Sequence, residues 1–118
     1  MASCSRDPTA AQVHKARLQV QPVIAFLNSH YLAAGQPLPE DQKELSRAYT
    51  EKTQVAYPME LIYVAERSQG PERYKLYLYV QMRTSLWYVS KTDPHDDTAQ
   101  GWWLDYDDGT PWVQVADP

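Results

Sequence analysis

The segment from residue 74 to residue 83 alternates between two kinds of side chain, and this pattern restricts the fold more than any other feature. Apolar or aromatic residues hold the even positions from Tyr74 to Met82, and polar or tyrosine residues hold the odd positions from Lys75 to Arg83. Successive side chains of a β-strand point to opposite faces, so the segment predicts a strand with one face buried. A second layer must cover that face.

The predicted second layer is an N-terminal helix over residues 9–34, which follows a flexible tail at residues 1–8. Thr9 offers a hydroxyl cap, and Gly35 ends the helical pattern. Pro22 lies inside the helix, where proline removes a hydrogen bond and crowds the previous turn, so we expect a kinked helix or two shorter ones. Apolar residues at spacings of three and four form the predicted inner stripe: Val13, Ala16, Val20, Val23, Leu27 and Tyr31.

The remainder of the chain predicts an antiparallel sheet over residues 57–116, preceded by a short helix or loop at residues 40–50. Aromatic residues concentrate after residue 56, and such side chains favour strands. In the first strand, one face is expected to carry Met59, Leu61, Tyr63 and Ala65. The later strands are expected at residues 85–90, 102–106 and 112–115, with a hairpin turn at residues 107–110. The 118 residues thus predict one α+β domain, a kinked N-terminal helix packed on a four- or five-stranded antiparallel sheet.

Charge and motifs exclude several function classes. The chain carries 11 basic and 15 acidic residues, a net charge of −4, whereas a nucleic-acid binder needs a basic surface. A single cysteine allows no internal disulfide and no cysteine-rich zinc site. The nucleophile, phosphate-loop and zinc-protease motifs are absent from the sequence, so we expect a non-enzymatic protein without a cofactor.

Residues 16–45 resemble the corresponding part of type IV pilins and of the pseudopilins of type II secretion. In that family a helix ends in a tyrosine and is followed by a glycine, a proline and a small polar helix; here these features are Tyr31, Gly35, Pro39 and the segment ending at Leu45. The resemblance implies a pilin-like fold and a subunit that assembles with neighbouring subunits in the bacterial cell envelope, on the periplasmic side. It also implies a set of helix residues that pack on the sheet: Val20, Ile24, Leu27 and Tyr31.

The apolar N-terminal segment that pilins use for assembly is not part of this sequence. Removal of a leader and of a membrane segment would account for the difference. Membrane attachment would then have run through a segment that precedes this chain.

Cys4 is a candidate lipid anchor. The tripeptide Ala2-Ser3-Cys4 resembles the end of a bacterial lipoprotein signal, in which small residues precede the cysteine that receives the lipid. An acyl chain would hold the domain at a membrane surface. On this alternative interpretation the protein is a lipid-anchored periplasmic binding or inhibitor protein, such as an immunity protein; otherwise Cys4 is an incidental thiol in the tail.

Aromatic and acidic residues of the strand-rich half form the candidate partner-binding site. Adjacent tryptophans in a strand point to opposite faces, so at least one of Trp102 and Trp103 is expected outside the core. Exposed tryptophan and tyrosine favour protein contacts, and neighbouring carboxylates suit a basic partner. The candidates are Tyr77, Tyr79, Trp87, Trp102, Trp103, Asp105, Asp107 and Trp112. The alternative is that these rings only cover a thin core.

The acidic clusters at residues 93–97 and 105–108 also raise the question of calcium. The second cluster lacks the twelve-residue loop and the closing glutamate of the common calcium loop. Adjacent aspartates at a hairpin are more often turn formers, so no metal site is predicted.

Overall fold

The computed structural model describes residues 8–66, 73–91 and 98–115. One long N-terminal helix packs on a five-stranded antiparallel sheet, so the predicted α+β architecture is confirmed. The helical elements are α1 (Ala10–Leu27), its π-helical continuation η1 (Asn28–Leu32) and α2 (Gln42–Thr53). The strands are β1 (Ile62–Glu66), β2 (Arg73–Gln81), β3 (Thr84–Val89), β4 (Gly101–Asp105) and β5 (Val113–Val115).

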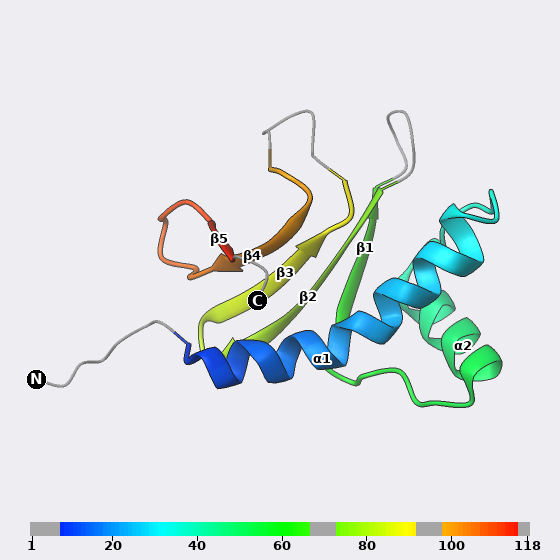
Figure 1. Ribbon diagram of the computed structural model, residues 1–118, viewed down its shortest axis with the longest axis horizontal. Helices are drawn as coiled ribbons and strands as arrows, with labels where there is room; N and C mark the ends of the chain where they lie inside the picture. The colour runs from blue at the N-terminus through cyan, green and yellow to red at the C-terminus, as the bar shows by residue number, and fades with distance from the viewer. Residues whose placement is uncertain (1–7, 67–72, 92–97, 116–118) are drawn as a thin grey trace, which may run out of the picture.

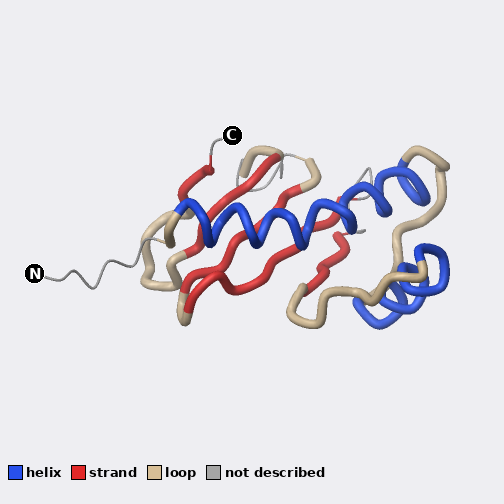
Figure 2. The backbone as a smooth tube through the Cα atoms, turned by 60° about the horizontal axis from the view of Figure 1, so that its bottom comes forward, coloured by secondary structure: helices blue, strands red, loops and turns tan. Residues whose placement is uncertain are grey.

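The sheet is a meander in which the strands follow one another in the order of the sequence, each antiparallel to its neighbour. Helix α1 lies across one face of this sheet, as the two views of the backbone show (Figure 1, Figure 2). The described residues place no helix on the opposite face, which is called the open face below.

Both ends of the N-terminal helix have the predicted signals. The Thr9 hydroxyl accepts a hydrogen bond of 3.1 Å from the Gln12 N–H, and the Gln12 side chain accepts one of 2.8 Å from the Thr9 N–H. This reciprocal pair is a capping box. At the other end Gly35 adopts a positive φ of 70°, and the Gln36 N–H donates to the Tyr31 carbonyl at 2.8 Å. A left-handed residue that ends a helix in this way is favoured as glycine.

Pro22 lies within α1, and the helix continues through it. Pro22 has no N–H to donate to the Leu18 carbonyl, so that carbonyl loses its usual helix hydrogen bond. The side chains of Leu18 and Pro22 are both exposed, so water can reach the carbonyl. In Figure 1 the axis of the helix changes direction near its middle. The predicted inner stripe is confirmed: Ala16, Val20, Val23 and Leu27 are buried, and Val13 and Tyr31 are partly buried against the core.

The core lies between α1 and the even-numbered residues of β2, among them Tyr74, Leu76 and Leu78. Two methionines that were expected on strand faces are instead exposed, Met59 to 92% and Met82 to 91%. Strand β1 begins only at Ile62, so Met59 precedes it in a turn. Met82 falls in the two-residue turn between β2 and β3, after a bulge between Tyr79 and Gln81.

Residues 42–53 form a helix, which resolves the alternative between helix and loop. The Asp41 carboxylate caps its N-terminus by accepting a hydrogen bond of 2.9 Å from the Glu44 N–H. Leu45 and Tyr49 of this helix are buried. Within the described residues, no helix is long and apolar enough to cross a membrane.

Candidate functional site

The open face of the sheet carries most of the candidate residues. Strand pairing sets Tyr77 opposite Trp87, and Trp87 opposite Trp103, across the three central strands. Because alternate residues share a face, Tyr79 lies on the same side as Tyr77, and Asp105 on the same side as Trp103. The sheet therefore brings candidates from β2, β3 and β4 together on the face away from α1.

Four of these aromatic rings form a continuous row: Tyr79, Tyr77, Trp87 and Trp112. The Tyr77 and Trp87 rings stack with centroids 4.0 Å apart and an interplanar angle of 16°. Trp112, which precedes β5, lies 4.7 Å from Trp87, and Tyr79 meets Tyr77 edge-on at 6.3 Å. This aromatic row is half-buried except for Tyr79, which is 53% exposed. Ring–ring packing of this kind stabilises the row itself and orders its side chains for contact with a partner.

The indole N–H groups of Trp87 and Trp103 are used inside the domain. The Trp87 N–H donates to the Ser85 hydroxyl at 2.9 Å, and the Trp103 N–H donates to the Ala99 carbonyl at 2.8 Å. These bonds fix the orientation of the two rings. The centre of the face thus holds aromatic rings, and the Tyr79 side chain, Asp105 and Lys75 are polar groups around them.

Trp102 lies on the other side of the sheet and does not belong to this surface. It is only 7% exposed, 5.1 Å from the Arg17 guanidinium and 5.1 Å from the Tyr88 ring. The prediction that at least one of the adjacent tryptophans lies outside the core is confirmed. Trp103 lies on the open face, and Trp102 lies in the core. The pairing of β4 with β3 decides which of the two faces inward, because Trp102 lies opposite Tyr88.

The acidic candidates lie at the end of β4 and in the turn that follows it. Asp105 accepts a hydrogen bond of 2.9 Å from the Asp107 N–H, and Asp108 accepts one of 3.0 Å from the Thr110 N–H. Asp107 is exposed and has a positive φ of 54°. The carboxylates of Asp105 and Asp108 thus shape the turn, as expected for aspartates at a hairpin. Among the described residues, no group of three or more metal-ligating side chains comes together. Cys4 and the acidic residues at 93–97 lie outside the described residues.

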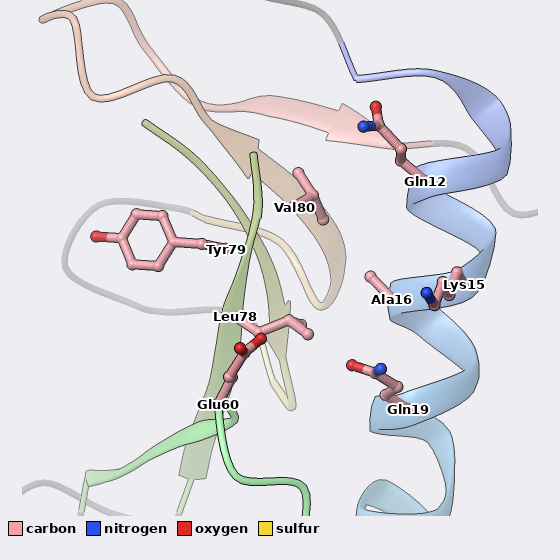
Figure 3. Close-up of a pocket in the computed structure, with 8 residues that line it drawn as sticks. All are labelled: Gln12, Lys15, Ala16, Gln19, Glu60, Leu78, Tyr79 and Val80. Atoms are coloured by element: carbon pink, nitrogen blue, oxygen red, sulfur yellow. The ribbon is translucent and has the colours of Figure 1, made fainter. Parts of the chain in front are cut away.

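A second surface feature was not foreseen from the sequence. A groove of about 270 Å³ runs between the N-terminal half of α1 and the end of β2 (Figure 3). Leu78 points towards the helix, whereas Tyr79 points away from it. The helix wall is formed by Gln12, Lys15, Ala16 and Gln19, and the sheet wall by Leu78, Tyr79 and Val80, with Glu60 at one end. β1 has five residues and β2 has nine, so the end of β2 that lines the groove has no β1 residue paired with it. The sequence predicted a longer first strand that included Met59, and this prediction gave no sign of a groove.

Comparisons with protein-family models, with curated proteins and with solved structures find no match to this chain.

Proposed function

We propose that this protein is a pilin-like subunit of a bacterial envelope assembly, and that it acts by binding other proteins rather than by catalysis. The observation that carries the proposal is the aromatic row on the open face. Helix α1 covers one face of the sheet only, and the row lies on the other face with Tyr79 more than half exposed. Large aromatic side chains bury much area at a small entropic cost, which is why they are frequent at the centres of protein interfaces.

The arrangement of the elements supports the pilin-like part of the proposal. An N-terminal helix followed by an antiparallel meander is the arrangement that the resemblance at residues 16–45 implies. Val20 and Leu27 are fully buried, and Ile24 and Tyr31 pack partly against the core. This burial supports the proposal, because the resemblance assigns these four residues to the packing of the helix on the sheet.

The alternative proposal is a lipid-anchored periplasmic binding or immunity protein that blocks a basic partner. Asp105 favours it, because this carboxylate lies on the same face as the aromatic row and at its margin. A negative group beside an apolar contact surface speeds association with a positively charged partner and selects for it. This proposal also requires an acyl chain on Cys4.

Site-specific photo-crosslinking in the source cells tests the proposed interface. A photoreactive amino acid at position 79, on the open face, is compared with one at position 21, an exposed position of α1. We expect position 79 to give a discrete crosslinked protein in the envelope fraction, and Trp87→Ala to reduce this product. Equal labelling from both positions, or labelling that Trp87→Ala leaves unchanged, contradicts the proposal.

Metabolic labelling separates the two proposals. Incorporation of labelled palmitate that is lost in Cys4→Ser supports the lipid-anchored alternative. Absence of lipid, together with a crosslinked partner that belongs to a secretion or pilus assembly, supports the pilin-like subunit.

A further inference from the structure

Strand β5 forms one end of the sheet, and in the described part of the chain no strand pairs with its outer edge. In Figure 2 the short strand that leads to the C-terminus lies at the margin of the sheet. Val113 and Gln114 are both exposed, so the place beside them is open to solvent.

The polar main-chain groups of Gln114 point outward, away from the sheet. The Ser90 N–H donates to the Tyr74 carbonyl at 3.1 Å, so the even-numbered residues of β2 direct their main chains towards β3. Followed through the register of β3 and β4, this alternation directs the main chains of Trp102 and Leu104 towards β5. The two residues of β5 that pair with them therefore face inward. Gln114, which lies between these two, directs its N–H and C=O to the outer side.

The other end of the sheet is less accessible. The Tyr63 N–H on the outer edge of β1 already donates to the Gln42 side chain at 3.0 Å. Helix α2, which carries Gln42, lies on that side of β1 (Figure 1). Unpaired main-chain groups on an edge strand invite pairing with another chain. The edge of β5 is therefore the better place to extend this sheet, and a second copy would meet it with the same edge.

We propose that two copies of this chain pair their β5 strands antiparallel to one another, about a two-fold axis that passes beside Gln114. The Gln114 N–H of each copy then donates to the Gln114 carbonyl of the other, so two hydrogen bonds form across the axis. Because both copies use the same edge, the contact is closed and gives a dimer rather than a filament. The inference goes beyond the proposed function, since it concerns an edge of the sheet and leaves the aromatic row free.

The side chains suit this register. Gln114 lies opposite Trp103 and so on the open face, and its amide nitrogen lies 3.6 Å from where a Cβ of Gly101 would stand. The amide is thus directed back over β4 and leaves the outer edge free. Val113 of each copy lies opposite Val115 of the other, on the helix side of the joined sheet. Val113 is 47% exposed in the single chain, so the contact buries an apolar side chain that the domain leaves in water.

The charges do not oppose the contact. Natural edge strands are commonly protected by charged side chains or proline, and none of the residues 113–115 is of either kind. Because the two strands are antiparallel, the acidic turns at residues 107–108 of the two copies lie at opposite ends of the contact. A strand of three residues offers little area, so we expect a weak dimer that forms at high protein concentration.

Disulfide trapping tests the register. In an antiparallel pair, opposite residues that exchange no hydrogen bond have Cα atoms about 4.5 Å apart, whereas diagonal residues are about 7–8 Å apart. A disulfide requires about 4.4–6.8 Å. Val113→Cys therefore matches Val115→Cys of the other copy and does not match itself. In a Cys4→Ser background, a mixture of the two variants should form disulfide-linked dimers at least about ten times faster than either variant alone. Equal rates in the mixture and in the single variants overturn the proposal.

Proline substitution tests the two hydrogen bonds. Both bonds use a Gln114 N–H, so Gln114→Pro removes both, and proline is tolerated at an outward position of an edge strand. In sedimentation velocity over a concentration series, wild type and the matched control Gln114→Ala should form dimers and no larger species. Gln114→Pro should dimerise at least about tenfold more weakly. Circular dichroism checks that the variant is folded, and the disulfide experiment, which needs no proline, decides if it is not.

Two results of the sedimentation experiment overturn the proposal. One is a wild-type chain that stays monomeric up to its solubility limit, and the other is a folded Gln114→Pro chain that dimerises like wild type. A monomeric wild type that still crosslinks to a partner from position 79 would reject the β5 contact and leave the proposed function standing. Loss of that crosslink with an intact β5 dimer would do the reverse.

Discussion

The Arg17 guanidinium lies 5.1 Å from the centre of the Trp102 ring, and both side chains are at least nine-tenths buried. A cation over the face of an indole is attracted by the negative charge of the ring face. This contact joins the first half of α1 to β4, far apart in the sequence. Trp102 is thus a structural residue of the helix–sheet interface, although Trp103 beside it belongs to the open face.

The adjacent tryptophans provide a matched pair of stability measurements. Trp102→Ala removes a large buried side chain and should lower the free energy of unfolding by about 3–5 kcal/mol. Trp103→Ala removes a half-buried ring from the open face, so its cost should be no more than about half as large. Urea denaturation followed by circular dichroism measures both. Equal costs for the two substitutions would contradict the assignment of Trp102 to the core and Trp103 to the open face.

The sequence predicts periodic features well and neighbour relations poorly. The stripe from Val13 to Tyr31 and the alternation along β2 were predictable, since each follows from the geometry of one element. Whether Trp102 or Trp103 faces the helix depends on how β4 pairs with β3, which no pattern within β4 specifies. The groove depends likewise on where β1 begins relative to β2. Met59 continues the alternation of the first strand in the sequence, so the pattern assigned it to that strand, whereas it lies in the turn before β1.

The Tyr74 hydroxyl donates a hydrogen bond of 2.8 Å to the Asn28 side-chain oxygen, which fastens η1 to the sheet. Tyr74 is fully buried whereas Asn28 is exposed, so the two partners should respond differently to removal. Tyr74→Phe leaves Asn28 free to bind water and should cost about 0.5–1.5 kcal/mol of unfolding free energy. Asn28→Ala leaves a buried hydroxyl without its partner and should cost about 1–3 kcal/mol.

The double variant is the control for this pair. Tyr74→Phe combined with Asn28→Ala should be no less stable than Asn28→Ala alone, because the buried hydroxyl is then absent. Additive costs in denaturation experiments would show that the two side chains act independently.

Alkaline pH should destabilise the domain through its buried tyrosines. Burial raises the pKa of Tyr74 above its usual 10.0, with smaller contributions from Tyr88 and Tyr63, and burial also raises the pKa of Tyr57. The stabilisation is complete below pH 10, where both the folded and the unfolded chain keep the phenol proton. Above pH 10 the unfolded chain loses that proton first, so the free energy of unfolding falls by up to about 1.4 kcal/mol per pH unit for each such tyrosine.

Chemical denaturation between neutral pH and pH 11 measures this dependence. Tyr74→Phe removes one of the titrating groups and should make the decline shallower, after its lower stability at neutral pH is subtracted. A decline of the same slope in wild type and Tyr74→Phe would contradict a raised pKa for Tyr74 in the folded chain.

The Gln42 side chain covers part of the outer edge of β1. Its side-chain oxygen accepts the hydrogen bond of 3.0 Å from the Tyr63 N–H, a main-chain donor that faces away from β2. Unpaired donors on an edge strand invite pairing with another chain. Gln42→Ala should therefore lower the free energy of unfolding by about 1 kcal/mol and increase self-association at the β1 edge.

Lys43→Ala, at the next and exposed position of α2, is the matched control. In sedimentation velocity, the Gln42→Ala chain should form larger species than either wild type or the control. A Gln42→Ala chain that sediments like wild type would contradict this role of Gln42.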